Sequence, residues 1–309
     1  MEPTREGNSM PLLEKIAPNT VLDSPEDDGA SHKSKEPLTA ENQEAIGRIV
    51  NLLAASHSIL FVTGAGISVD SGLPTFRGAD GLYSVDTAED CMPIERALSG
   101  DILCDHPELT WKYLARMEKV CRCARHNRAH EVIVEMERHF ERVWTLTQNV
   151  DGLHRRAGAR NVIDIHGDLH RLRCMRCLYR QTVEDYSALT FPPHCPKCPG
   201  LLRPDVVLFG EPLSLERLMI LFTELDDGFD LVFSIGTSSV FSYIAEPVRM
   251  AAQFGRPTVE INPGVSEVSD LVDIKLPMRA APALDAIWRM YQLRTTDFVA
   301  GHVARAGVC

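Results

Sequence analysis

Short apolar runs and amphipathic stretches alternate along most of the chain. A first helix is predicted after Thr39, a residue able to cap it, because apolar side chains recur on one face at Ile46, Ile49, Val50 and Leu53. Six apolar runs predict strands at 58–63, 143–147, 161–165, 206–209, 231–235 and 258–261. Continuous apolar strands that alternate with helical patterns are typical of an α/β fold, a parallel sheet with helices on both faces.

Glycine and polar side chains stand directly after five of these strands, at Gly64, Gln148, His166, Gly236 and Asn262. The carboxyl ends of parallel strands meet at one edge of a sheet, and ligands bind to open α/β sheets outside that edge. The five positions therefore predict one ligand site built by strands that lie far apart in the sequence.

Two segments interrupt the alternation. Residues 84–131 are mostly helical and polar in pattern, and residues 170–205 carry closely spaced cysteines. We expect both to be insertions that together form a second, smaller lobe. Residues 1–38 carry four basic and eight acidic side chains without apolar periodicity, and we expect a disordered tail there. Residues 295–309 are predicted to form a frayed C-terminal tail.

Composition narrows the classes of function. The 309 residues are 44% apolar and 24% charged, which is typical of a globular protein, and no apolar run approaches the roughly 20 residues that span a bilayer. The formal net charge of −11 disfavours nucleic acid as a direct partner. The first ten residues lack the apolar core of a secretory signal, so we expect a cytoplasmic protein, with mitochondria and nucleus as alternatives.

Four of the nine cysteines form two CxxC pairs, Cys174 with Cys177 and Cys195 with Cys198, separated by 17 residues. This spacing is typical of a tetrahedral zinc site, and the odd number of cysteines argues against a secreted disulfide framework. Four thiolates leave no coordination position for water, so the predicted zinc is structural. A redox pair and an iron–sulfur cluster are the alternatives that the spacing leaves open.

The sequence GAGIS (64–68) follows the first predicted strand and opens a predicted helix. Backbone N–H groups at such a helix start can hold a pyrophosphate, and glycine permits its close approach. Val69 occupies the position of a third glycine, however, so a structural tight turn would explain the loop equally well.

Several motifs occur in an ordered series along the chain. They are GAGIS and SGLPTFRG within 64–78, TQNVDGLH (147–154), IHGDLH (165–170), the two CxxC pairs, LFGE (208–211), GTSS (236–239) and INPG (261–264). Together they resemble the sirtuins, which are NAD-dependent protein lysine deacylases. The resemblance implies a catalytic domain at 39–294, with a Rossmann-like large lobe (39–83, 132–169, 206–294), a small helical lobe (84–131) and a zinc module (170–205).

The resemblance also implies which residues would bind NAD and the acylated lysine side chain of a protein substrate. They are Gly64, Ala65, Gly66 and Ser68 for the diphosphate, Phe76 and Arg77 beside the nicotinamide ribose, Gln148, Asn149 and Asp151 around the ribose and nicotinamide, and Gly236, Thr237, Ser238, Asn262 and Pro263 for the adenosine half.

The implied reaction releases nicotinamide and O-acyl-ADP-ribose. His166 would be the general base for a ribose hydroxyl, because the unperturbed pKa of histidine, roughly 6.5, suits that task. Asn149 would orient the hydrolytic water. As alternatives, Asn149 and Asp151 could merely cap the following helix, while His154 and His170 are expected to be mainly structural.

The acyl group is less well determined. Tyr113 and Arg116 have the Tyr-x-x-Arg spacing that some sirtuins use to bind a dicarboxylic acyl chain, and side chains three apart share a helix face. The pair predicts desuccinylation or demalonylation beside deacetylation. A shift of register would instead place Leu114 or Met117 at the acyl pocket.

Other functions remain as alternatives. The same NAD site could transfer ADP-ribose to protein, and a zinc-stabilised scaffold is the non-enzymatic alternative. The intact set of Asn149, Asp151 and His166 argues against an inactive scaffold. A hydride-transferring dehydrogenase is disfavoured, because the third glycine of its dinucleotide loop is missing.

Overall fold

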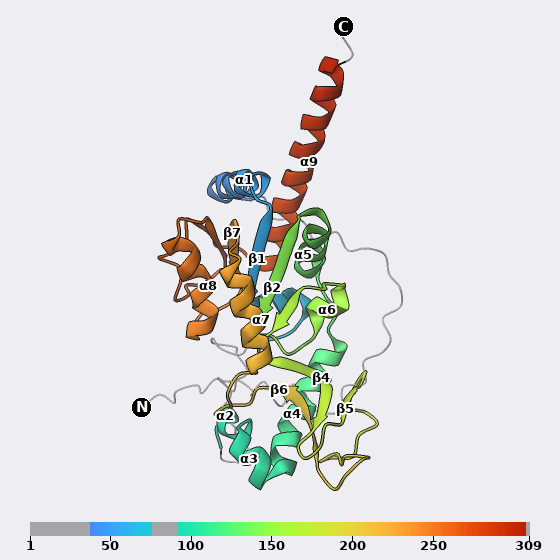
Figure 1. The fold of residues 1–309 in the computed structure, drawn as a ribbon. Coiled ribbons are helices and arrows are strands. Elements are labelled where there is room, and N and C mark those ends of the chain that lie inside the picture. Colours follow the sequence, from blue (N-terminus) through green and yellow to red (C-terminus); the bar gives the residue numbers. More distant parts are fainter. Residues whose placement is uncertain (1–37, 76–91, 307–309) are drawn as a thin grey trace, which may run out of the picture.

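The computed structural model describes residues 38–75 and 92–306, with side chains placed as far as 295. Nearly all of the predicted N-terminal tail lies outside these residues, as do Phe76 and Arg77. Within the described part, a large lobe carries a parallel sheet and a small lobe lies at one end of it (Figure 1).

Six parallel strands form the large sheet, in the order β3-β2-β1-β7-β8-β9. Their bounds are β1 Ser58–Thr63, β2 Arg142–Thr147, β3 Val162–Asp164, β7 Leu231–Ile235, β8 Thr258–Ile261 and β9 Ile274–Leu276. The chain builds outward from β1 on one side and from β7 on the other, so the strand order reverses between β1 and β7. Crevices at such a reversal are the usual ligand sites of open α/β sheets.

Helices cover both faces of this sheet, as the continuous apolar strands predict. In β1, Ile59 and Phe61 face one core, while Leu60 and Val62 face the other. The first core is closed by α1 (Ala40–Ala54), α5 (Arg128–His139) and α9 (Ala280–Ala306), and the second by α7 (Leu215–Asp226) and α8 (Ser242–Gln253). The predicted cap of α1 is present.

That cap is a hydrogen bond in which the Asn42 backbone N–H donates to the Thr39 hydroxyl oxygen over 3.1 Å. The last helix differs from the prediction, because α9 continues to Ala306, past the domain boundary expected at 294. Its length does not make it a membrane span: no helix in the described part of the chain is both long and apolar enough to cross a bilayer.

One predicted strand is wrong. Residues 206–209 do not join the parallel sheet; instead, β6 (Leu202–Val206) pairs antiparallel with β4 (Gly167–Cys174), which also pairs with β5 (Arg180–Thr182). The remaining apolar residues of this run, Val207 to Phe209, form a loop against a cavity wall. Their hydrophobic pattern therefore reflects burial between the lobes rather than a strand.

The predicted small lobe is confirmed as a second hydrophobic core. Its helices α2 (Ile94–Ala97), α3 (Gly100–Asp105) and α4 (Pro107–Cys123) pack against the β4–β6 sheet and the cysteine-bearing loops. Trp111 of α4 is fully buried there, and its indole N–H donates to the Leu202 carbonyl oxygen over 3.2 Å. Both insertions thus form one unit, visible below the large sheet in Figure 1.

Glycines allow the loop after β1 to pack closely against the loop after β7. The short 3₁₀ helix η2 (Ala65–Ser71) starts directly after β1, and the Gly66 N–H donates to the Gly236 carbonyl oxygen over 2.8 Å. A Cβ atom added at Gly236 would lie 2.6 Å from the Gly66 backbone, and Gly236 has a φ of +56°. Only glycine fits this contact without displacing one of the loops.

We therefore expect Gly236→Ala to lower the free energy of unfolding by about 2–4 kcal/mol, through left-handed strain and overpacking. Denaturant unfolding would measure this loss. Gly47→Ala is the matched control, because a Cβ at Gly47 in α1 would meet no atom within 4 Å. The control should raise stability by about 0.5–1 kcal/mol. Equal effects of the two substitutions would contradict the proposed contact.

Candidate active site

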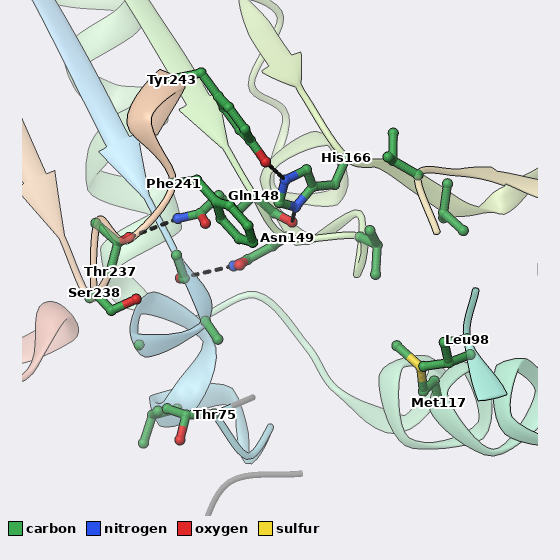
Figure 2. Close-up of a pocket in the computed structure, with 18 of the residues that line it drawn as sticks. Thr75, Leu98, Met117, Gln148, Asn149, His166, Thr237, Ser238, Phe241 and Tyr243 are labelled. Carbon is green, nitrogen blue, oxygen red and sulfur yellow. Dashed lines mark hydrogen bonds between the residues drawn. The ribbon is translucent and has the colours of Figure 1, made fainter. Parts of the chain in front are cut away.

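A cavity of about 850 Å³ lies at the carboxyl ends of the parallel strands, between the large and small lobes. All five residues expected to converge after strands line it: Gly64, Gln148, His166, Gly236 and Asn262. The sheet topology thus brings together positions that are almost 200 residues apart in sequence. Figure 2 shows Gln148 and His166 at this cavity.

The large-lobe wall combines backbone and amide groups suited to a dinucleotide. From the predicted NAD residues it contains Gly64, Ala65, Gly66, Gln148, Asn149, Gly236, Thr237, Ser238, Asn262 and Pro263. The side-chain amides are held in place: Gln148 donates to the Thr237 hydroxyl over 2.7 Å and Asn262 donates to the Thr237 carbonyl oxygen over 3.1 Å. Both amides are therefore anchored on Thr237.

Asn149 has an unused acceptor in this wall. Its amide nitrogen donates to the Gly64 carbonyl oxygen over 3.0 Å, which fixes the orientation of the side chain (Figure 2). Its amide oxygen is buried and has no hydrogen-bond partner among the described residues. A buried acceptor without a partner costs free energy that a donor on a bound ligand can recover. The wall therefore fits a nucleotide that presents N–H or O–H groups.

Two predicted NAD residues do not line the cavity. The buried Asp151 carboxylate accepts from the Ser68 hydroxyl over 2.8 Å and from the Leu153 N–H over 2.9 Å, at the start of α6 (Leu153–Ala157). Burial raises the pKa of Asp151, although both hydrogen bonds oppose that shift. Asp151 and Ser68 thus bond each other behind the cavity wall, and Asp151 also bonds the first residue of α6.

His166 lies on the cavity wall between the two lobes, directly after β3. Its Nδ1 is 3.0 Å from the Gln148 carbonyl oxygen and its Nε2 is 2.7 Å from the Tyr243 hydroxyl oxygen. Burial lowers its pKa to about 4, with a smaller contribution from the nearby Arg217 cation. His166 is thus neutral at physiological pH, which is the protonation state of a general base.

Other histidines lie off the cavity wall, as expected. The buried His154 contacts the Thr63 hydroxyl, with its Nε2 atom 3.0 Å from Oγ1, and burial lowers its pKa to about 4. His170 in β4 lies between the carboxylates of Glu118 and Asp168, at 3.7 and 3.5 Å. Both residues connect secondary-structure elements.

The small-lobe wall is apolar, and the two residues predicted for the acyl pocket are not on it. Helix α4 places Leu114 and Met117 on the wall. Met117 lies beside Leu98 and across the cavity from Thr237 and Ser238 (Figure 2). Neither Tyr113 nor Arg116 lines the cavity. Tyr113 is buried in the small-lobe core, and the Arg116 guanidinium carbon lies 5.8 Å from its ring centre. One residue step turns a helix by about 100°, so Leu114 faces the cavity while its neighbour Tyr113 faces the small-lobe core.

The loop after β6 completes this wall and joins the lobes. The Val207 N–H donates to the His166 carbonyl oxygen over 2.8 Å, and the Phe209 N–H donates to the Leu98 carbonyl oxygen over 3.0 Å. Glu211, at the end of the LFGE motif, forms a bidentate ion pair with Arg203 in β6. These contacts hold the apolar residues from Val207 to Phe209 on the cavity wall with the His166 imidazole.

The four predicted zinc ligands converge at the far end of the small lobe. Their Sγ atoms all lie within 4.8 Å of one another, with Cys174 and Cys198 3.5 Å apart and Cys177 and Cys195 3.7 Å apart. A tetrahedron with Zn–S bonds of about 2.3 Å has S–S edges of about 3.8 Å, so the arrangement fits one zinc ion. The four cysteines are the whole cluster among the described residues, which agrees with a closed, structural site.

Comparisons with known proteins agree with this geometry. The Sir2 family profile matches residues 64–242, which include the glycine loop, His166 and the cysteines. The chain belongs to the Sir2 family. It is 46% identical over 243 residues to an NAD-dependent protein deacylase 2 of Pseudomonas aeruginosa, covering 78% of this chain and 94% of the relative. An NAD-dependent protein deacylase of Aeropyrum pernix is 38% identical, with coverage of 80% and 97%.

Solved Sir2 structures share the fold. The crystal structure of a Sir2 homolog–NAD complex has a TM-score of 0.73 and 34% sequence identity, covering 80% of this chain and 94% of that one. A structure described as the basis for the mechanism and regulation of Sir2 enzymes has a TM-score of 0.71 and 32% identity, with coverage of 81% and 98%. The two-lobed architecture is thus that of the Sir2 family.

Phe241, Tyr243 and Arg279 are among the lining residues of this Sir2 cavity that the sequence analysis missed. The GTSS motif could have indicated the first two, because they follow it within five residues. No motif in the sequence indicates Arg279. It follows β9, a strand of three residues that was not predicted, and pairs with Asp70 of η2 over 2.9 Å.

Zinc should stabilise this Sir2 chain, since a structural metal contributes folding free energy. We expect Cys174→Ala to lose the bound zinc and to lower Tm by about 5–10 °C, which corresponds to about 2–3 kcal/mol in a chain of this size. Zinc content by atomic absorption and a thermal melt would measure both. Cys104→Ala, at an exposed position in α3, should change neither quantity. Full zinc occupancy with an unchanged melt in Cys174→Ala would exclude the site.

Proposed function

We propose that this chain, an NAD-dependent protein deacylase, removes apolar acyl groups from lysine side chains and uses His166 as the general base. One observation carries the proposal: the His166 imidazole lines the cavity where a polar wall meets an apolar wall. An acylated lysine side chain matches the two walls, because it has a polar amide and an apolar acyl chain.

The polar wall would hold NAD. Gly64, Ala65 and Gly66 offer backbone groups at the start of η2 for the diphosphate, and Asn262 with Pro263 borders the adenosine half. Asn149 would receive a hydrogen bond at its unpartnered oxygen. Bound NAD supplies the ribose carbon that the acyl oxygen attacks as nicotinamide leaves. The lobes position these groups and limit the access of water.

His166 would take the proton of a ribose hydroxyl at Nε2. The Gln148 carbonyl oxygen, an acceptor, faces Nδ1, so the ring proton of neutral His166 resides on Nδ1, and the Nε2 lone pair is left to accept, in this structure from the Tyr243 hydroxyl. Burial stabilises this neutral state. Asn149 would orient the hydrolytic water through the amide oxygen that has no partner among the described residues.

The apolar wall supports an uncharged acyl group. Leu98, Leu114, Met117 and the loop at 206–209 surround the small-lobe side of the cavity. Arg279 is the one Lys or Arg among the described lining residues, and it lies at the η2 side, paired with Asp70. A succinyl or malonyl carboxylate would lose hydration on the apolar side without gaining a cationic partner from the described wall, which is unfavourable. We therefore favour acetyl and longer aliphatic acyl groups.

His166→Ala should lower kcat/KM for acetyl-lysine peptide by at least about a hundredfold, because a general base typically contributes that much. The assay is nicotinamide release together with mass spectrometry of O-acyl-ADP-ribose. His57→Ala, at an exposed histidine before β1, is the matched control and should retain activity. A thermal melt should show that both variants are folded. Retained turnover in folded His166→Ala would remove His166 from the mechanism.

The product also separates the main alternative. If NAD consumption yields peptide or protein that carries ADP-ribose, with no free lysine and no O-acyl-ADP-ribose, the chain is a transferase of ADP-ribose and the deacylase proposal is wrong.

Acyl preference can be tested on α4. We expect kcat/KM for a hexanoyl-lysine peptide to exceed that for a succinyl-lysine peptide at least tenfold, since an unpaired carboxylate is poorly accommodated in an apolar pocket. Met117→Trp should fill the pocket and lower hexanoyl turnover relative to acetyl turnover by about tenfold. Peptides that differ only in the acyl group would be compared under one set of conditions.

Arg116→Met is the neighbouring control on the same helix. Because Arg116 lies off the cavity wall, the ratios among acetyl, hexanoyl and succinyl peptides should change less than about twofold. A selective loss of succinyl turnover in Arg116→Met would instead support the Tyr113–Arg116 pair as a dicarboxylate site and contradict the apolar assignment.

A further inference from the structure

Tyr243 contacts the imidazole of His166 in an arrangement that the sequence motifs do not indicate. Its ring lies in the first turn of α8 and stacks on Phe241, with ring centres 5.5 Å apart and planes at 14°. Both rings meet His166 edge to face, at 5.8 Å for Phe241 and 5.9 Å for Tyr243. This packing directs the phenol hydroxyl at Nε2 (Figure 2).

The direction of the hydrogen bond follows from the other ring nitrogen. Nδ1 of His166 lies 3.0 Å from a carbonyl oxygen, which can only accept, so Nδ1 is protonated in the neutral ring. Nε2 then has only a lone pair, and the Tyr243 hydroxyl donates to it over 2.7 Å. The phenol thereby occupies the atom that must accept the substrate proton.

We propose that Tyr243 is a positioning residue for His166: its hydroxyl holds the imidazole neutral and aimed into the cavity, and yields its place on Nε2 to the ribose hydroxyl. The proposal rests on the proposed role of His166 as the general base. No covalent bond is formed by Tyr243, and its own proton stays on the phenol oxygen. The ribose hydroxyl replaces the Tyr243 hydroxyl as the hydrogen-bond donor to the Nε2 lone pair of His166.

Neighbouring charges act in the same direction as the phenol. Arg217, at the start of α7, is the cation that faces His166, and it also pairs with Asp164 and Asp205 at 3.4 and 2.8 Å. A hydrogen bond donated to Nε2 favours the neutral ring, because protonation of that nitrogen would break the bond. Removing the phenol hydroxyl should therefore raise the pKa of His166, while Arg217 and burial continue to lower it.

The test compares Tyr243→Phe with the unmodified protein in two measurements. An NMR titration of the histidine rings, with the His166 signal assigned by its absence in His166→Asn, gives the pKa of His166 directly. The dependence of kcat/KM on pH, measured with acetyl-lysine peptide and NAD, gives the pKa of the essential base in the free enzyme. We expect both values to rise by about half a unit to one unit in Tyr243→Phe, as expected for the loss of one neutral hydrogen bond.

Tyr291→Phe is the matched control. Tyr291 in α9 also bonds a histidine, with its hydroxyl oxygen 3.0 Å from Nε2 of His139, but it lies outside the cavity wall. This control removes the same atom from the same kind of pair and should leave the His166 pKa and the pH profile unchanged.

The outcomes separate this inference from the proposed function. An unchanged or lowered His166 pKa in Tyr243→Phe, or an equal shift in Tyr291→Phe, overturns the role of Tyr243. A raised His166 pKa without a matching shift of the pH profile supports the hydrogen bond but excludes His166 as the titrating base. A rise in both values, with the control unchanged, supports both.

Discussion

The contact between the loop after β1 and the loop after β7 is the constraint on which the site depends. At this point the strand order reverses, and the backbones of Gly66 and Gly236 approach more closely than any side chain would allow. The approach brings η2, Gln148 and Thr237 into one wall, where Gln148 bonds Thr237 directly. The glycines therefore have a structural reason to be present before any ligand is considered.

His166 stands at the junction of the two lobes for a topological reason. It separates β3, the last strand on one side of the large sheet, from β4, the first strand of the small sheet. Its carbonyl oxygen accepts from Val207, so the loop that returns from the small lobe is bonded to the same residue. A single residue thus belongs to the backbone connection between the lobes and to the cavity between them. Small movements of one lobe against the other would change the surroundings of its imidazole.

Much of the fold and the nucleotide wall could be predicted, because strand ends are local features whose convergence follows from parallel pairing. The residues that face the cavity from the small lobe could not be predicted. The rotation of α4 about its axis decides whether Tyr113 and Arg116 or Leu114 and Met117 face the cavity, and contacts such as Trp111 with Leu202 set that rotation. The strand predicted at 206–209 was wrong for a related reason. Residues buried between two lobes and residues buried in a sheet give the same apolar pattern.

The division of the cavity into a polar and an apolar wall has a consequence for the base. Apolar surroundings lower the pKa of an imidazole because they disfavour its charged form, whereas the proposed role of His166 as general base requires the ring to accept a proton. The ring nitrogen must therefore be a poor base at rest and gain support for its charge during the reaction. The Gln148 carbonyl oxygen provides such support, since it accepts a hydrogen bond from Nδ1 that becomes stronger when the ring is protonated. His166 is thus placed where burial keeps it unprotonated and a fixed backbone dipole offsets part of the cost of protonation.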